Sequence, residues 1–315
     1  MKNQHPVSKP HIIINPLSAA GRTGRRWKSY ITAVENRLGK NYSVHFTQTQ
    51  LDAIFSARRA INEGCELVIA VGGDGTINEV VNGFFDHGQI INPECLLGII
   101  NSGTGHGFAQ SLGLHKSIDL QLDAISRRRY KSIDVGRITF MNPGGELTGR
   151  YFVNECQIGI GGMVVKNVVP RYKRFGGKFA FGLIAFLTAL SDKKRQFTLE
   201  IDSSIETSAS LHGIVVGNGA YTGGGMMLTP SAKVDDGLLD VLSIREQSVL
   251  QRIMNLSKVH SGRHITSPKF SYRQCTSLSI VSPSDVPIAA DGEILGTPPC
   301  TISILPHALR VCSQN

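Results

Sequence analysis

The feature that most constrains the fold is the stretch formed by residues 67–78, LVIAVGGDGTIN. Its apolar part is continuous rather than alternating and ends in glycines, which is typical of a buried strand in a parallel sheet. Gly72, Gly73 and Gly75 can adopt positive φ angles and let another backbone or a phosphate come close. We expect Thr76 and Asn78 to start a helix whose first amides point into the turn, so the stretch predicts a phosphate-binding turn.

Asp74 lies in the middle of this turn, where a carboxylate would repel a bare phosphate. Its presence predicts a Mg²⁺ ion or a water network between the carboxylate and the phosphate. A plain Gly-Asp-Gly turn between a strand and a helix is the structural alternative. A second glycine cluster at residues 102–107, SGTGHG, favours the binding site.

The order of the predicted elements indicates an α/β fold with two domains. Up to residue 136, strands alternate with helices, which predicts a doubly wound, mainly parallel sheet that binds its ligand at the carboxyl ends of the strands. Residues 137–306 contain short strands separated by Gly, Pro and Ser turns, which predicts a mainly antiparallel, β-rich domain. The tail, residues 307–315, is expected to return to the first domain. The expected strands are 11–15, 42–47, 67–71, 96–101, 131–140, 151–160, 197–202, 211–218, 238–244, 276–281 and 301–305, and the expected helices are 22–38, 52–63 and 117–129.

Composition limits the classes of protein that remain. The chain has 315 residues, of which 41% are hydrophobic, and six cysteines without a CxxC pair. This favours a globular protein with reduced, packed thiols in the cytoplasm. A formal charge of +9 implies an anionic partner, such as a nucleotide, an anionic lipid surface or nucleic acid. The N-terminal residues lack a secretory apolar region, and no apolar stretch reaches the length of a spanning helix.

The segment GGDGTINEVV resembles the nucleotide-binding signature of the diacylglycerol kinase catalytic-domain family, which includes sphingosine kinases, ceramide kinases and soluble bacterial lipid kinases. The resemblance extends over nearly the whole chain, with the motifs in the family's order. It implies an ATP- and Mg²⁺-dependent kinase that phosphorylates the hydroxyl group of a lipid such as diacylglycerol or a sphingoid base. It also implies an active site in the cleft between the two domains.

The resemblance and the glycine turns together assign the nucleotide-binding residues. They are Asn15, Thr47, Gly72, Gly73, Asp74, Gly75, Thr76, Asn78, Glu79, Gly103 and Thr104. The chain departs from the family at three positions: Ala19 and Leu51 replace glycines, and Gly107 replaces an aspartate of an acidic water-and-metal network. His106 stands where the family has asparagine, and we interpret it as a hydrogen-bonding residue rather than a base.

The resemblance also implies the remaining site residues. Asp291, in the turn formed with Gly292 and Glu293, would be the general base, and Glu293 and Asp74 complete the predicted catalytic set. The segment KVDDGLLD at residues 233–240 resembles a structural Mg²⁺ loop, in which Asp236 and the main-chain carbonyls of Lys233 and Leu238 would be the ligands. An Asp-Gly hairpin turn and an acidic turn are the structural alternatives.

A basic and apolar segment, residues 166–195, is the most membrane-like part of the chain. Its apolar stretch, FAFGLIAFLTAL at residues 179–190, is too short to span a bilayer but can lie at an anionic surface or pack in the core. We therefore expect a cytoplasmic protein that binds transiently to the inner membrane surface. A homodimer remains open, and no nucleic-acid partner is expected because no nucleic-acid-binding motif accompanies the charge.

Alternative functions remain open at this point. An NAD kinase shares the GGDGT turn and a related plan, although its turn is not usually followed by Asn-Glu-Val. A catalytically silent nucleotide or lipid sensor would explain why Leu51 and Gly107 replace family residues. The chain contains no GxxxxGK[ST] loop, complete GxGxxG fingerprint, HExxH site or GxSxG elbow.

Overall fold

The computed structural model describes residues 9–103, 106–114, 117–167, 183–184, 186–188, 190–203, 205–283 and 285–314. The chain divides into two compact units. The first comprises Met1–Gly103, Leu112–Ile133 and His307–Asn315, and the second comprises Thr104–Ser111 and Asp134–Pro306.

The first unit is built on a parallel sheet with the strand order β2-β1-β3-β6-β16. Its strands are β1 (His11–Ile14), β2 (Ser43–Phe46), β3 (Leu67–Gly72), β6 (Leu96–Asn101) and the C-terminal part of β16 (Glu293–Cys312). All residues of β3 and β6 are buried, as expected for strands covered on both faces. The parallel pairing agrees with the arrangement predicted from the alternating elements, and Arg310 of β16 pairs with Leu96 as the tail returns to this sheet.

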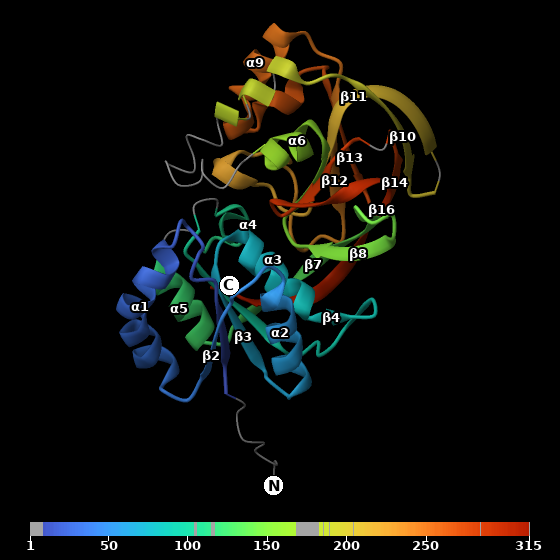
Figure 1. Cartoon of the computed structure of the whole chain (residues 1–315). Helices are drawn as coiled ribbons and strands as arrows, with labels where there is room; N and C mark the ends of the chain where they lie inside the picture. The colour runs from blue at the N-terminus through green and yellow to red at the C-terminus, as the bar shows by residue number, and fades with distance from the viewer. Residues whose placement is uncertain are drawn as a thin grey trace. The chain divides into compact units, whose positions relative to one another are not determined.

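Helices cover both faces of this sheet. Figure 1 shows α1 (Arg22–Leu38) and α5 (Ile118–Ser126) on one face, and α2 (Asp52–Asn62) and α3 (Asp74–Gly83) on the other. Trp27 of α1 and Leu122 of α5 pack in one core cluster with alternate residues of β1 and β3. A short hairpin, β4 (Phe85–Asp86) and β5 (Gln89–Ile90), follows α3. The layered core keeps the carboxyl ends of the strands free to carry loops.

The second unit is mainly antiparallel. Its pairings run β11–β9–β15–β16–β14–β10 and return to β11, so these strands form a closed circuit. Inward side chains such as Ile158, Leu278 and Ile302 make up its core. Its strands are β7 (Tyr130–Met141), β8 (Leu147–Phe152), β9 (Glu155–Gly159), β10 (Arg195–Ile201), β11 (Ile205–Gly217), β12 (Leu239–Arg245), β13 (Phe270–Cys275), β14 (Ser277–Val281), β15 (Ile288–Ala290) and β16.

Several elements of the second unit were absent from the sequence prediction. They are α4 (Gly107–Ser111), α6 (Ile160–Asn167), α9 (Val249–Leu256), β13, β15 and the short 3₁₀ turns η1 (Gly223–Gly225), η2 (Val259–Ser261) and η3 (Arg263–Thr266). The predicted strand 151–160 is also wrong, because the backbone leaves strand geometry between β8 and β9. The start of α9 had a readable signal: Ser248 and Gln251 form a capping box.

All six cysteines are free and buried, as predicted for packed thiols. Within the part of the chain that the structure describes, no helix is long and apolar enough to cross a membrane. Residues 179–182, 185 and 189 of the predicted apolar stretch 179–190 lie outside the described residues.

Candidate active site

The glycine turn between β3 and α3 is built by close packing. A Cβ atom on Gly72 would lie 2.4 Å from Oγ1 of Thr76, so only glycine fits at this position. The buried hydroxyl of Thr76 also accepts a 3.1 Å hydrogen bond from Nδ2 of Asn15, at the end of β1. Two predicted nucleotide-binding residues from different strands are thereby brought together at the carboxyl end of the sheet.

Two details of the predicted turn are wrong. Gly72 belongs to β3, Gly73 is extended with φ of −94°, and Gly75 lies inside α3, so none of these glycines supplies a positive φ angle. The helix also begins at Asp74 rather than at Thr76 or Asn78. An aspartate at the first position of a helix is stabilised by the partial positive charge of that end. The glycines are therefore needed for close approach, not for an unusual conformation.

The second glycine loop packs directly on the first. Ser102 and Gly103 both donate their amide hydrogens to the carbonyl oxygen of Gly72, at 2.9 and 3.2 Å. A Cβ atom on Gly103 would lie 2.6 Å from Cα of Gly73, so the two backbones are in contact. The amide of Gly103 also donates to Oδ1 of the buried Asn101. Thr104, the next predicted binding residue, lies outside the described residues.

A chain of hydroxyl groups connects the loop after β1 with the second glycine loop, and sequence reasoning missed it. Ser18 is hydrogen-bonded to Thr23, and Oγ1 of Thr23 lies 2.7 Å from Oγ of Ser102. Thr23 is buried in the first turn of α1. The basic residues Arg22 and Arg25 of the same helix are exposed and contact the carbonyls of the preceding loop.

At two departures from the family the backbone keeps the conformation that a glycine would favour. Ala19 and Leu51, which replace family glycines, have φ angles of 53° and 68°, in the left-handed region that favours glycine. The strained turn at Leu51 is held by Glu79, whose Oε1 accepts the amide hydrogen of Leu51 at 3.1 Å. Glu79 thus positions this turn from α3. Nearby, Thr47 is buried and donates its amide hydrogen to Ile14.

In the second unit, Asp291 is a buried and firmly held carboxylate. Its Oδ2 accepts the amide hydrogen of Val153 at 2.9 Å, and its Oδ1 accepts those of Asn154 and Glu155, each at 3.0 Å. The side chain is only 5% exposed. Amide donors of this kind stabilise a charged carboxylate and fix its orientation. The residue has φ of 46°, as expected for the tight turn that joins β15 to β16.

A second buried carboxylate, Glu155, lies next to this turn and was not predicted. The carbonyl of Glu155 accepts the amide hydrogen of Asp291 at 3.0 Å. Oε1 of Glu155 accepts hydrogen bonds from Nε2 of Gln157, at 2.8 Å, and from the hydroxyl of Thr222. Glu293, by contrast, is half-buried at the start of β16, where it pairs with Ala290. The alternation of β9 places Glu155 and Gln157 on one face, which is the signal that could have found them.

The predicted metal loop is curled around the buried Asp134, which sequence reasoning also missed. Oδ2 of Asp134 accepts the amide hydrogen of Gly237 at 2.7 Å, and Asp134 donates its own amide hydrogen to Val234. Asp236 is exposed, and its Oδ1 accepts the amide hydrogen of Leu238. No cluster of three Asp, Glu, His or Cys side chains suited to a metal occurs among the described residues. A cation here would therefore depend on Asp236 and main-chain oxygens, which are hard ligands that suit Mg²⁺.

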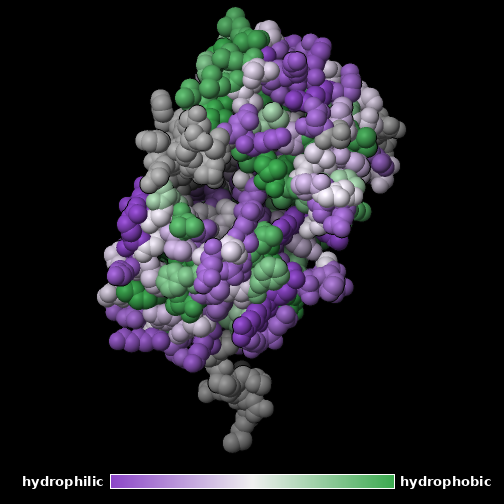
Figure 2. All heavy atoms as spheres, viewed as in Figure 1, coloured by the Kyte–Doolittle hydropathy of each residue, from purple (hydrophilic) through white to green (hydrophobic). Residues whose placement is uncertain are grey.

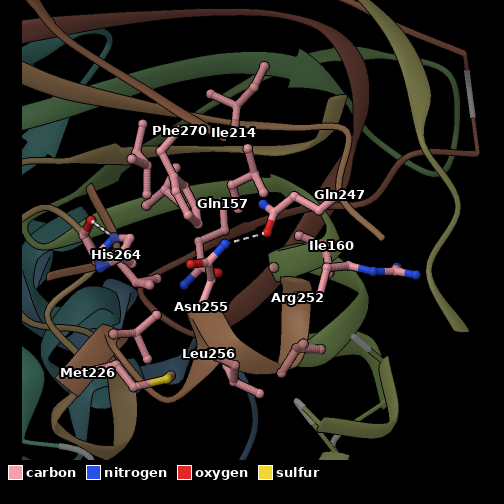
Figure 3. Close-up of a pocket in the computed structure, with 17 residues that line it drawn as sticks. Gln157, Ile160, Ile214, Met226, Gln247, Arg252, Asn255, Leu256, His264 and Phe270 are labelled. Atoms are coloured by element: carbon pink, nitrogen blue, oxygen red, sulfur yellow. Dashed lines mark hydrogen bonds between the residues drawn. The ribbon is translucent and has the colours of Figure 1, made fainter. Parts of the chain in front are cut away.

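An apolar pocket lies within the second unit (Figure 3). Its walls come from β9, α6, β11, β12, α9 and β13. The lining residues are Gln157, Ile160, Gly161, Val164, Ile214, Val215, Met226, Leu228, Leu242, Ile244, Gln247, Arg252, Asn255, Leu256, Val259, His264 and Phe270. Its lining suits an apolar ligand.

A few polar groups of this pocket are held in fixed positions. Nδ2 of Asn255 donates to Oε1 of Gln247 at 2.7 Å, as Figure 3 shows. Nε2 of His264 lies 3.1 Å from the carbonyl oxygen of Leu228, and burial lowers the pKa of His264 below its ordinary 6.5. The ring is therefore neutral at pH 7, with Nε2 as the donor. Its other nitrogen, Nδ1, has no hydrogen-bond partner among the described residues.

These sites define a class of protein in which an α/β unit carries a glycine turn at the carboxyl end of its parallel sheet and a β-rich unit carries an apolar pocket. Comparison with family models gives the same division. Residues 9–138 match the diacylglycerol kinase catalytic domain, and residues 156–313 match the YegS C-terminal NAD kinase beta sandwich-like domain. The chain belongs to the diacylglycerol kinase catalytic-domain family, and it is a lipid kinase.

Known relatives extend over the whole chain. A diacylglycerol kinase from Staphylococcus haemolyticus is 30% identical over 96% of this chain and 88% of its own length. A diacylglycerol kinase from Staphylococcus aureus is 28% identical over 98% of this chain and 93% of its own length. The resemblance to the family stated from the motifs is confirmed.

Solved structures show the same fold. The crystal structure of a diacylglycerol kinase from Bacillus anthracis superimposes with a TM-score of 0.70 at 20% identity, covering 99% of this chain and 98% of that one. An NAD kinase from Archaeoglobus fulgidus, solved in complex with ATP, gives a TM-score of 0.51 at 12% identity over 97% of this chain and 94% of its own. NAD kinases are therefore more distant in fold.

Proposed function

We propose that this lipid kinase transfers the γ-phosphoryl group of ATP to a hydroxyl group of a lipid that has at least one long apolar chain. The observation that carries the proposal is the apolar pocket of the second unit, which is lined largely by aliphatic side chains. A soluble polar acceptor such as NAD would not use such a lining, because its polar groups would lose hydrogen bonds to water. The relatives' names support diacylglycerol among the candidate acceptors.

The nucleotide would bind at the first glycine turn. The N-terminus of α3 presents backbone amides there, and a helix N-terminus favours phosphate groups. Gly72, Gly73 and Gly103 let Thr76 and the second glycine loop pack closely beside these amides. Asn15, Thr47, Asp74, Gly75, Asn78, Glu79 and Thr104 complete the proposed nucleotide-binding set, and Glu79 acts there by positioning Leu51.

Asp291 is the proposed general base. The acceptor oxygen forms a bond to the γ-phosphorus while the bond from that phosphorus to the bridging oxygen of ADP breaks, and the hydroxyl proton passes to the carboxylate. Amides of Val153, Asn154 and Glu155 hold this carboxylate in a fixed orientation. Glu293, which follows Asp291 in the same turn, and Asp74 complete the proposed catalytic set.

A Mg²⁺ ion fits the donor set of the 233–238 loop. The proposed ligands are the carboxylate of Asp236 and the carbonyl oxygens of Lys233 and Leu238, and Asp134 fixes the loop through the amide of Gly237. Mg²⁺ bound with the nucleotide would neutralise the charge of the phosphates. Asp74, at the first position of α3, is the residue of the glycine turn suited to such an ion.

A phosphorylation assay tests this function. The purified chain is incubated with Mg²⁺ and γ-labelled ATP in mixed micelles that contain diacylglycerol, a sphingoid base or a ceramide, and with NAD as a non-lipid acceptor. We expect labelled phospholipid from at least one lipid and no labelled NADP. Removal of Mg²⁺ by a chelator should stop the reaction, and Asp291→Asn should slow it by about 10²–10⁴-fold.

The same assay separates the alternatives. Labelled NADP without labelled lipid would show an NAD kinase. Binding of ATP without any labelled product would show the silent sensor that the replacements at Leu51 and Gly107 suggested. Either result would refute the proposed function.

A further inference from the structure

Helix α9 is oriented against the usual rule for a surface helix. Its outer side chains are apolar: Val249, Leu250 and Met254 are 43%, 67% and 54% exposed. A helix on a globular protein normally turns such a stripe toward the core and its polar residues toward water. Leu250 and Met254, four positions apart, are neighbours on one face of the helix.

Two polar residues of α9, Arg252 and Asn255, are directed inward and held by specific hydrogen bonds, whereas Gln251 is exposed. Asn255 is buried and donates to Gln247, and Nη1 of Arg252 donates to the carbonyl oxygen of Asp192 at 2.7 Å. Ser248 and Gln251 cap the helix start. These contacts fix the rotation of the helix, so its apolar face is displayed by the fold and is not a result of a loosely attached helix.

A second apolar segment accompanies α9. Leu183, Phe186 and Leu187 are 46%, 37% and 52% exposed. The bond from Arg252 to Asp192 ties the end of this segment to α9. Figure 2 shows hydrophobic residues gathered over the region that α9 occupies in Figure 1. We call the exposed apolar residues of α9 and of this segment the α9 face. Exposed apolar surface of this kind marks a site for a partner.

Basic residues predominate in the part of the sequence that contains α9. Between residues 245 and 273 the sequence has six Lys or Arg residues and one acidic residue, Glu246. Glu246 is paired with Lys194 at 2.7 Å. Lys258 and Arg263, which follow α9, are exposed. Apolar side chains with basic neighbours are the combination that binds an anionic lipid surface.

The α9 face also adjoins the apolar pocket. Arg252, Asn255 and Leu256 line that pocket from the inner side of α9, as Figure 3 shows. Helix α9 is therefore a wall between the pocket and the α9 face, so a bilayer at that face would hold its lipids close to the pocket.

We infer that the α9 face docks on the surface of an anionic bilayer and that the lipid substrate enters the apolar pocket from there. This inference rests on the proposed function for the identity of the substrate, whereas the docking itself does not require turnover.

Vesicle flotation with the full-length chain tests the docking. Wild-type protein should float with vesicles of phosphatidylcholine and phosphatidylglycerol, and much less with phosphatidylcholine alone. Leu250→Glu combined with Met254→Glu should reduce the bound fraction at least about tenfold, because each side chain loses its burial in the interface. Lys258→Glu combined with Arg263→Glu should reduce binding to the anionic vesicles.

Leu147→Glu is the control, since Leu147 is 69% exposed at the start of β8 and also gains a negative charge. It should float like the wild type, and all variants should keep the wild-type melting temperature. Flotation of the α9 double variant at the wild-type level would overturn the inference, as would an equal loss in the control. If light scattering instead showed a dimer that the α9 variant dissociates, with no vesicle binding, the face would belong to self-association.

Kinase assays separate this inference from the proposed function. With a short-chain diacylglycerol that dissolves as monomers, the α9 double variant should match the wild type, but with long-chain acceptor in vesicles it should be slower. A wild-type protein that floats but phosphorylates no lipid would refute the proposed function and leave the docking intact. A wild-type protein that phosphorylates lipid but never floats would refute the docking and leave the proposed function intact.

Discussion

Asp291→Asn should destabilise the second unit as well as remove the proposed base. Oδ1 of Asp291 accepts two amide hydrogens, from Asn154 and Glu155, and Oδ2 accepts a third, from Val153. An asparagine has only one carbonyl oxygen. If that oxygen replaces Oδ1, the new NH₂ group faces the amide of Val153, so that two donors meet in a buried place.

The size of the effect follows from these contacts. A hydrogen bond to a charged group contributes about 1.5–3 kcal/mol, and a buried donor left without a partner costs about 1–3 kcal/mol. The lost hydrogen bond and the unpaired donor are partly the same cost, so the two values do not add in full. We expect Asp291→Asn to lower the free energy of unfolding by about 2–4 kcal/mol. A residue that acted only as a base would instead lose about 10²–10⁴-fold in rate with its stability unchanged.

Urea unfolding of the full-length chain measures this, with Asp202→Asn as the matched control. Asp202 also has a positive φ angle in a turn, but it is exposed, and its bonds from the amides of Thr276 and Ser277 and the hydroxyl of Thr276 all go to Oδ1. Asparagine can keep all of these bonds, so the control should lose less than about 0.5–1 kcal/mol. An Asp291→Asn protein as stable as the wild type would refute the reasoning.

Two further changes test other parts of the molecule. Gly103→Ala should weaken ATP binding, measured by calorimetry, at least about tenfold, because its Cβ would lie 2.6 Å from Cα of Gly73 and force the two glycine loops apart. Gly223→Ala is the control and should bind ATP normally, because nothing lies within 4 Å of the added Cβ. Burial lowers the pKa of His264 in the folded protein below 6.5, so the unfolded chain binds a proton at a higher pH than the folded one. The free energy of unfolding should therefore fall as the pH drops below about 6.5. His264→Gln, which keeps a donor for Leu228, should flatten this dependence in urea unfolding between about pH 7 and pH 5.

The first unit could be predicted closely because its signals are local. Continuous apolar runs such as β3 and β6 bounded by glycines have few other interpretations, and the helices between them carry a clear period. What failed there was the role of the glycines. Whether Gly72 is needed for its φ angle or for lack of a Cβ depends on Thr76, whose distance is set by the start of α3.

The second unit was harder because its structure depends on distant contacts. Asp291 is bound to residues more than 130 positions earlier, and nothing in the pattern around Asp291 specifies those partners. The apolar pocket likewise collects residues from position 157 to position 270. The outward apolar face of α9 contradicts the amphipathic rule, so a pattern-based interpretation would have buried it.

Gly107 shows how a departure from the family can be part of a consistent local structure. A Cβ atom at Gly107 would lie 3.0 Å from the carbonyl oxygen of Tyr221 and 3.1 Å from Nδ2 of Asn154, which itself donates to Tyr221 at 2.6 Å. Restoring the family aspartate would bring a carboxylate against that carbonyl and disturb Asn154, whose backbone amide donates to Oδ1 of Asp291.

We therefore expect Gly107→Asp to lower the free energy of unfolding by about 1–3 kcal/mol, as overpacking does, and to reduce the kinase rate rather than raise it. Gly107→Ala adds only the Cβ atom, 3.0 Å from the carbonyl oxygen of Tyr221, which needs only a small shift of that neighbour. It should lower the free energy of unfolding by about 1 kcal/mol or less. Urea unfolding and the micelle assay on both variants decide the matter. A faster and equally stable Gly107→Asp enzyme would mean that the space next to Tyr221 can open, and that the aspartate was lost for a reason other than packing.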